Sequence, residues 1–387
     1  GSFAYVSDRW AEFRAWLRDR GVTPEIIPQQ NEDWDGHILH TLSNVWIRLL
    51  RKDGWNDLTA VGELVVSLRE SQPEREEAYL LDADHDGTVK PKAWRLIALY
   101  HWARASELIA EYMMQGTPVG IQAELDFHFE RAIDASQSAL DAPTEVTLKW
   151  LHLLSSRMVA GSLWSLTSAG RETRNLVSVK TRSALFEFLP PQRSALLEQG
   201  LLDQASTAVV VDLPTSAGKT VLAEFKAVQA LNQFKEERGW VAYVAPTRAL
   251  VAQITRRLRK DLSPIGIRVE QLTAAVELDD IEQQMVTQAD EPFDVLVATP
   301  EKLHLLIRNG IVERPLSLMV FDEAHNIADK QRGVRVDILL ATVKQDCPEA
   351  NFLLLMPFVP NADDLANWLS PQSGRSISLG SSAWQPN

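Results

Sequence analysis

The stretch from Thr207 to Thr220, TAVVVDLPTSAGKT, decides the fold of the second half of the chain. Its valines, 209–211, are β-branched and show no polar alternation, which predicts a strand buried on both faces of a parallel sheet. A loop of small residues follows and ends in Gly218-Lys219-Thr220, after which residues 221–228 have a helical pattern. The stretch therefore predicts a strand, a loop and a helix N-terminus, with backbone N–H groups and the positive end of a helix dipole at one point.

An anion-binding site is expected at this point. Lys219 can reach the oxygens of the β- and γ-phosphates of a nucleotide, and the hydroxyl of Thr220 can bind Mg²⁺. The strict pattern for such a loop has Gly five residues before Gly218, where this chain has Leu213. The small residues 215–217 still keep the loop compact. The alternative is a strand–turn–helix with a chance Gly-Lys-Thr.

Length and composition limit the classes of protein to which the chain can belong. Its 387 residues are enough for two or three domains, and its 45% hydrophobic content is ordinary for a protein that folds in water. The single cysteine, Cys347, excludes an internal disulfide framework and favours a reducing compartment, here the cytoplasm. No apolar run has transmembrane length, so we expect no membrane contact. Because the net charge is −13, any nucleic acid is expected to bind in a local basic groove.

Residues 1–180 are predicted to form an all-helical domain. Amphipathic patterns begin near residues 7, 38, 57, 91, 118 and 144, and they imply a bundle or array of helices. Residues 165–180 are rich in Ser, Thr and Gly, which predicts a connection to the next domain. This helical domain is expected to bind a protein partner or to be an accessory to the rest of the chain.

Residues 181–387 alternate between apolar runs and helical patterns, which predicts an α/β domain with a mostly parallel sheet. In such a domain the ligand site lies at the carboxyl ends of the strands. The predicted strands are 208–211, 240–244, 269–272, 295–297, 318–321 and 352–355, and the predicted helices are 219–235, 247–260, 280–288, 301–308 and 334–344.

The strand predicted at 318–321 delivers two carboxylates, Asp322 and Glu323, in the tetrapeptide Asp-Glu-Ala-His. Asp322 can hold the water shell of Mg²⁺, and Glu323 can orient or deprotonate an attacking water. A polar strand exit explains one carboxylate, but not this tetrapeptide about a hundred residues after Gly-Lys-Thr. Lys219, Asp322 and Glu323 are therefore the predicted catalytic residues.

Four motifs together resemble motifs I, Ia, Ib and II of superfamily 2 helicases, in order and in spacing. They are residues 214–220 (PTSAGKT), 245–253 (APTRALVAQ), 298–302 (ATPEK) and 322–325 (DEAH). The first motif and residues 360–369 (PNADDLANWL) are similar to the Ski-like branch of that superfamily. The resemblance covers residues from about 186 onward. It implies a RecA-like P-loop ATPase domain over residues 181–376 that uses ATP and Mg²⁺.

The resemblance also implies roles for individual residues. The segment FLPPQ, 188–192, resembles the family's Q motif, so Gln192 is the expected adenine reader. The nucleotide would contact Gln192, Pro214, Thr215, Ser216, Ala217, Gly218, Lys219 and Thr220, with Mg²⁺ at Thr220 and Asp322. The backbone of a single strand of DNA or RNA would lie against Pro246, Thr247, Arg248, Thr299 and Pro300, whose hydroxyls, amides and guanidinium suit phosphate contacts.

Two departures from the family pattern affect the expected activity. Met356-Pro357-Phe358 stands where the family has Ser-Ala-Thr, whose hydroxyls help to link the ATP site to strand movement. The family also has a second RecA-like domain that supplies arginines, and residues 377–387 are expected to begin the linker to that domain, which this sequence lacks. A missing arginine finger costs on the order of 10³ to 10⁵ in rate, so we expect these residues alone to hydrolyse ATP slowly.

Two functions stay open at this point. The first is an ATP-dependent helicase or translocase on nucleic acid. The second is a partner-binding module in which the ATPase domain is a nucleotide-gated switch for an effector such as a nuclease. The chain resembles bacterial anti-phage helicases of the Hachiman type, which pair a Ski-like motor with a nuclease. A small-molecule kinase would leave the motifs at 245–253 and 322–325 without a role.

Overall fold

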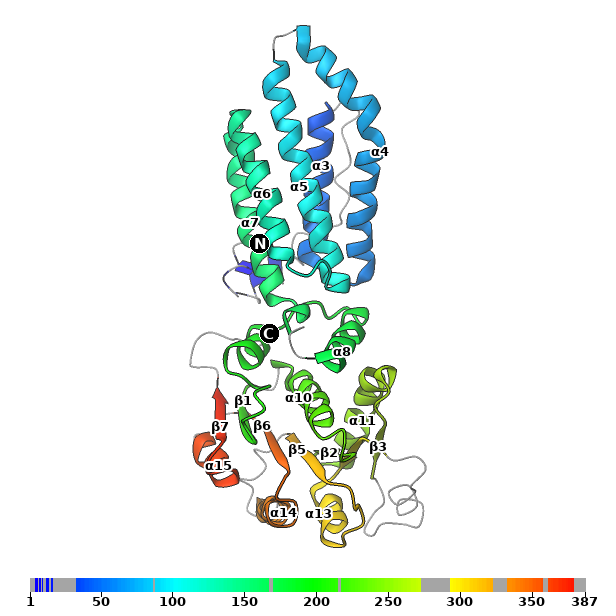
Figure 1. Cartoon of the computed structure of the whole chain (residues 1–387), viewed down its shortest axis with the longest axis vertical. Coiled ribbons are helices and arrows are strands. Elements are labelled where there is room, and N and C mark those ends of the chain that lie inside the picture. The colour runs from blue at the N-terminus through cyan, green and yellow to red at the C-terminus, as the bar shows by residue number, and fades with distance from the viewer. Residues whose placement is uncertain are drawn as a thin grey trace. The chain divides into compact units, whose positions relative to one another are not determined.

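The computed structural model describes residues 33–85, 88–166, 170–214, 217–272, 293–322, 333–357 and 361–378, with a few residues among the first 16. The chain divides into two compact units (Figure 1). A helical unit contains residues 1–168 and 180–188, and a sheet unit contains residues 169–179 and 189–386.

The helical unit is built from long helices that pack against their neighbours in sequence (Figure 1). They are α3 (Trp34–Arg51), α4 (Trp55–His85), α5 (Val89–Gln115), α6 (Ile121–Ser138) and α7 (Ala142–Gly161), followed by the short helix η1 (Leu163–Leu166). The mostly helical character predicted for this region is confirmed. The helix predicted near residue 7 lies largely outside the described residues.

The apolar stripe of α3 shows why these segments are helical. Ile38, Leu42, Val45 and Leu49 are completely buried and recur at the three- and four-residue spacing of one helix face. Trp46 adds a polar link, because its indole Nε1 donates to the Ser106 hydroxyl of α5 at 2.9 Å. Burial of this stripe therefore stabilises the helix and determines which of its faces packs against α5.

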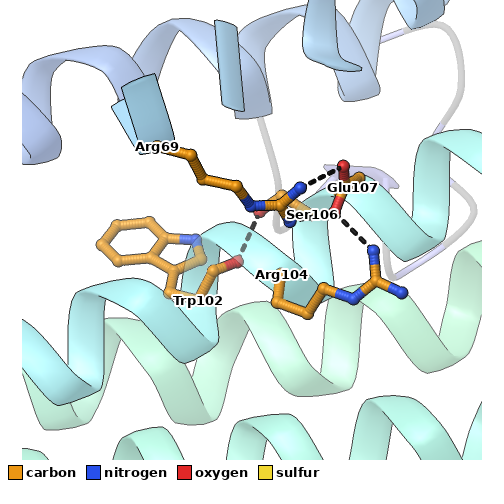
Figure 2. Close-up of polar contacts among 5 residues, drawn as sticks. All are labelled: Arg69, Trp102, Arg104, Ser106 and Glu107. Carbon is orange, nitrogen blue, oxygen red and sulfur yellow. Dashed lines mark hydrogen bonds and ion pairs between the residues drawn. The ribbon is translucent and has the colours of Figure 1, made fainter. Parts of the chain in front are cut away.

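A charged cluster ties α4 to α5. Figure 2 shows the Glu107 carboxylate of α5 receiving hydrogen bonds from the guanidinium of Arg69, on α4, and from that of Arg104, on α5. Burial alone would raise the pKa of Glu107, but the bonds and charges of the two arginines hold it below its ordinary value. The carboxylate therefore stays ionised where it is 8% exposed.

The segment predicted as a connection, residues 165–180, contains the helix α8 (Gly170–Arg182), which was not predicted as a separate helix. The Ser, Thr and Gly content of this segment suggested a loop, although its buried residues recur at helical spacing. Thr173, Leu176, Val177, Lys180 and Thr181 are all buried and follow the spacing of one helix face. Burial of that stripe outweighs the weak intrinsic helix propensity of the segment.

The sheet unit contains seven parallel strands, which confirms the α/β prediction. They are β1 (Ala208–Asp212), β2 (Trp240–Val244), β3 (Val269–Gln271), β4 (Val295–Ala298), β5 (Leu316–Asp322), β6 (Asn351–Met356) and β7 (Gly374–Ser378). Their order in the sheet is β3-β4-β2-β5-β6-β1-β7. The six predicted strands are present, and β7 was not predicted.

Helices cover both faces of this sheet (Figure 1), with α10 and α11 on one side and α13, α14 and α15 on the other. Their bounds are α10 (Lys219–Gln233), α11 (Arg248–Leu262), α13 (Pro300–Arg308), α14 (Gly333–Asp346) and α15 (Ala362–Leu369). Shorter helical segments are α9 (Pro190–Arg193), η2 (Ser194–Glu198) and η4 (Ser263–Ile265). The helix predicted at 280–288 lies outside the described residues.

Alternation along the strands sets which side chains face which helices. Val210, Ala242 and Phe321 belong to one buried cluster with side chains of α13, α14 and α15. Because successive side chains of a strand point to opposite faces, Val209, Tyr243 and Asp322 lie on the other face, which α10 and α11 cover. The carboxyl ends of the strands therefore bring residues of this second face close to the start of α10.

Candidate active site

A cavity of about 270 Å³ lies at the carboxyl edge of the sheet. Its lining combines residues from the start of α10, the end of β5 and the segment after β2. These are Gly218, Lys219, Thr220, Pro246, Leu250, Gln253, Ile254, Arg257 and Asp322. The structure thus brings together three of the predicted nucleotide contacts, the predicted metal-binding carboxylate and one predicted nucleic-acid contact.

The start of α10 has the form of an anion site. Gly218 precedes the helix with φ of +69°, a conformation that disfavours a side chain. Lys219 and Thr220 are the first two residues of the helix, where backbone N–H groups have no partner within the helix. Lys219 is 6% exposed, so its ammonium group is held inside the domain rather than in bulk water.

Gln192 lies directly beside this loop and is 2% exposed. Its Oε1 accepts a hydrogen bond from the Leu189 N–H at 3.0 Å, and its Nε2 donates to the Gly218 carbonyl at 3.1 Å. A Cβ at position 218 would lie 2.4 Å from that nitrogen, so only glycine permits this approach. A side-chain amide has a second N–H and a second lone pair, which keeps the predicted adenine contact chemically possible.

Asp322 is held by a buried tyrosine. The Tyr243 hydroxyl, at the second-last residue of β2, donates to Oδ2 of Asp322 at 2.9 Å. Tyr243 is 1% exposed. Burial, followed by the charge and the hydrogen bond of Asp322, raises the pKa of Tyr243 well above its ordinary value. The phenol is therefore protonated and donates to the carboxylate.

A completely buried carboxylate contacts one residue of the cavity lining. Glu224 of α10 is completely buried, and Nε of Arg257, on α11, lies 3.4 Å from its Oε1. The pair joins the helix that begins at the phosphate loop to the helix that begins after β2. Arg257 is partly exposed and also lines the cavity.

These residues fit a magnesium nucleotide. The ammonium of Lys219 and the amides at the start of α10 suit phosphate oxygens. Thr220 and Asp322 offer a hydroxyl and a carboxylate, which are the oxygen ligands that Mg²⁺ prefers. The donor set and the cavity that it lines agree with the chemistry that the sequence predicts for ATP.

The predicted nucleic-acid residues follow two adjacent strands. Thr247 and Arg248 begin α11 after β2, and Thr299 and Pro300 begin α13 after β4. Because β2 and β4 are paired, both helix N-termini lie along one edge of the sheet. Thr247 and Arg248 are exposed, but Pro300 is buried, and the Thr247 hydroxyl accepts from the Leu250 N–H at 3.3 Å.

Some predicted site residues cannot be placed. Thr215, Ser216 and Glu323 lie outside the described residues, whereas Pro214 is half-buried and Ala217 is completely buried. Met356 ends β6 opposite Asp212 of β1, and its carbonyl accepts from the Leu213 N–H at 3.1 Å. The Met356 side chain is 2% exposed and belongs to the buried cluster with α13, α14 and α15, on the sheet face opposite to Asp322.

Tyr243 and Glu224 were not singled out by the sequence. Tyr243 stands in an apolar run, and Glu224 stands in an ordinary helical pattern, whereas Gln253 ends the motif at 245–253 and Arg257 lies in the basic end of the same predicted helix. One signal was available, because a tyrosine in a doubly buried strand needs a partner for its hydroxyl. Only the pairing of β2 with β5 shows which partner that is.

Among the described residues, no helix is long and apolar enough to cross a membrane. The same part of the chain holds no group of three or more His, Cys, Asp or Glu residues that could bind a metal ion.

Comparisons with known proteins agree with this geometry. Residues 190–356 match the family model described as DEAD/DEAH box helicase. The ATP-dependent DNA helicase Hel308 of Methanocella arvoryzae is 30% identical over 207 residues, which cover 53% of this chain and 26% of the relative. The Hachiman protein HamB of Bacillus cereus is 24% identical over 246 residues, 61% of this chain and 21% of the relative.

Among solved structures, the yeast DEAD-box splicing factor Prp28 aligns with a TM-score of 0.45 and 18% identity. The alignment covers 55% of this chain and 50% of that one. The chain spans about a quarter of the length of the curated relatives described here.

Proposed function

We propose that this chain, whose residues 190–356 match the DEAD/DEAH box helicase model, is part of an ATP-dependent helicase or translocase on nucleic acid. The observation that carries the proposal is the cavity at the sheet edge. Its lining includes the helix N-terminus proposed to bind phosphate, the carboxylate proposed to bind Mg²⁺ and the start of the segment expected to touch a nucleic-acid strand.

The residues have separable roles in this proposal. Lys219 and the amides at the start of α10 hold the phosphates of ATP, and Thr220 and Asp322 hold Mg²⁺, which neutralises phosphate charge when bound. Glu323 orients or deprotonates the water that attacks. Gln192 contacts adenine from beside the loop.

Single-stranded DNA or RNA is the proposed polymer, held by its backbone along the starts of α11 and α13. Helix N-termini and hydroxyls hold phosphates without reading bases. The similarity to Hel308, named as a DNA helicase, supports a nucleic-acid substrate. The likeness to the Hachiman protein HamB supports a role in anti-phage defence.

A protein partner for the helical unit is also proposed, with a cytoplasmic location suggested by the single cysteine. Met356 and Pro357, in place of hydroxyl residues, favour a second function in which nucleotide binding is a switch for an effector. A stoichiometric partner that binds the whole chain only with nucleotide would support that function.

The direct test measures binding of a fluorescent ADP analogue to the 387-residue chain, with and without single-stranded oligonucleotides. The proposal expects Mg²⁺-dependent nucleotide binding and affinity for single strands of mixed sequence. Hydrolysis by these residues alone is expected to be slow, because the arginines of the family come from a second RecA-like domain. A chain that binds no nucleotide would contradict the proposal.

A further inference from the structure

We propose that Tyr243 is a positioning residue that fixes the Asp322 carboxylate for Mg²⁺, an inference that rests on the proposed function. Asp322 was expected to hold the metal, but nothing in the sequence indicated what orients it. The structure places a buried phenol hydroxyl 2.9 Å from its Oδ2.

The register of the sheet explains how the two side chains meet. Tyr243 of β2 lies opposite Val320 of β5, two residues before Asp322. Because alternate residues of a strand share a face, all three side chains lie on the face covered by α10 and α11. The tyrosine ring thus extends along the strand direction to the last residue of β5.

The hydroxyl has a defined direction. Tyr243 is 1% exposed, so packing fixes its ring, and a phenol has only its terminal oxygen to offer. The hydroxyl of Tyr243 is the donor and Oδ2 of Asp322 is the acceptor. This bond restrains rotation of the carboxylate in the cavity wall, as partners behind a metal ligand do in other proteins.

The surrounding charges support this arrangement. The charge of Glu224, completely buried on α10, acts on Tyr243 together with that of Asp322. Arg257 offsets part of this negative charge, with its Nε 3.4 Å from Glu224. Tyr243, Glu224 and Arg257 therefore form a polar group next to Asp322.

A purely structural role is the alternative, because any buried tyrosine hydroxyl needs a partner. The two roles differ in what they predict for Tyr243→Phe, which keeps the ring and removes the oxygen. A positioning role predicts weaker use of Mg²⁺ by a folded protein. A structural role predicts lower stability with unchanged Mg²⁺ dependence.

The experiment titrates Mg²⁺ into the 387-residue chain with a fluorescent ADP analogue and compares the result with binding in EDTA. For Tyr243→Phe we expect metal-free nucleotide affinity within about twofold of the original. The Mg²⁺ concentration at half-saturation should rise about 10-fold or more, in the range usual for loss of such a partner. Excess Mg²⁺ should restore full binding.

Tyr112→Phe is the matched control, because Tyr112 is 7% exposed and lies in α5 of the helical unit. It should leave the Mg²⁺ titration unchanged. A folded Tyr243→Phe protein with the original Mg²⁺ concentration at half-saturation would overturn this inference but not the proposed function. A Tyr243→Phe protein that cannot fold would also overturn it, because the hydrogen bond would then be needed for folding. If the unsubstituted chain binds no nucleotide, the proposed function fails as well.

Discussion

The side-chain nitrogen of Gln192 donates a hydrogen bond to the carbonyl oxygen of Gly218, 3.1 Å away. This bond connects the segment before β1 to the loop that precedes α10. Gln192, the expected adenine reader, is therefore coupled to the loop expected to hold the phosphates. A substitution in one should change the position of the other.

Gly218→Ala should lower stability and weaken nucleotide binding. The new Cβ would lie 2.4 Å from Nε2 of Gln192, and φ of +69° adds a strain of about 1–2 kcal/mol. Urea unfolding and nucleotide titration measure the two effects. Gly266→Ala is the control, because Gly266 has φ of +83° with nothing within 4 Å of its Cβ position. Equal effects of the two substitutions would show that the contact with Gln192 does not matter.

Lys219→Ala should abolish measurable nucleotide binding while the fold is kept. Loss of a buried cation opposite phosphate oxygens costs about 2–5 kcal/mol, at least about 30-fold in affinity. Fluorescence titration with a nucleotide analogue checks binding, and circular dichroism checks the fold. Lys235→Ala provides the control, since the Lys235 side chain is 73% exposed beyond the far end of α10. Undiminished affinity in a folded Lys219→Ala protein would contradict the phosphate role.

Glu323→Gln should retain nucleotide and block turnover in a protein that includes the second RecA-like domain. Removal of a general base typically costs about 10²- to 10⁴-fold in rate. Single-turnover hydrolysis measures the chemical step, and Glu349→Gln, at an exposed position, serves as the control. Hydrolysis by Glu323→Gln at the original rate would remove Glu323 from the mechanism.

Glu107→Gln should destabilise the helical unit. The substitution removes the negative charge that Arg69 and Arg104 share, where the residue itself is 8% exposed. Because both arginines are partly exposed, we expect a loss of about 1–2 kcal/mol rather than the full cost of breaking a buried pair. Chemical denaturation followed by tryptophan fluorescence measures it, with exposed Glu111→Gln on the same helix as control.

Two histidines should make the helical unit less stable in acid. Burial and, to a smaller extent, the charge of Arg131 lower the pKa of His101. Burial and, to a smaller extent, the charges of His101 and Arg104 lower the pKa of His128. A folded-state pKa below the unfolded value of about 6.5 means that the unfolded chain binds protons first, so stability falls as pH drops through 6.5 toward the folded values. Thermal unfolding between pH 8 and 5 tests this, and His128→Gln should reduce the dependence. A flat profile in the unsubstituted chain would contradict it.

The strands were predictable because buried parallel strands have a distinctive composition. Val209 to Val211 are completely buried, as an uninterrupted β-branched run requires. Strand β7 was missed because Gly-Arg-Ser-Ile-Ser has one completely buried residue, Ile377, and lies at the sheet edge, where polar side chains are tolerated. Helix α8 was missed because composition was weighed above the spacing of its buried residues.

The motif residues of the site could be named from sequence because their types and order repeat a chemical requirement. Lys219 and Asp322 belong to separate strand ends, and the parallel sheet brings both to one cavity. The polar group next to Asp322 could not be predicted. Whether Tyr243 meets Asp322 depends on the pairing of β2 with β5, and whether Arg257 meets Glu224 depends on the packing of two helices.

The place of β1 in the sheet has a consequence for how the domain is made. Val210 pairs with Leu354 of β6 and with Ser376 of β7, and both partners emerge from the ribosome long after it. Until then the nascent chain exposes β1 as an apolar strand without hydrogen-bonded neighbours. The chain between β1 and β6 forms a long loop, and closing a long loop is slow. We expect a chaperone to bind β1 during translation. We also expect a protein truncated before residue 351 to aggregate rather than to fold into a smaller domain.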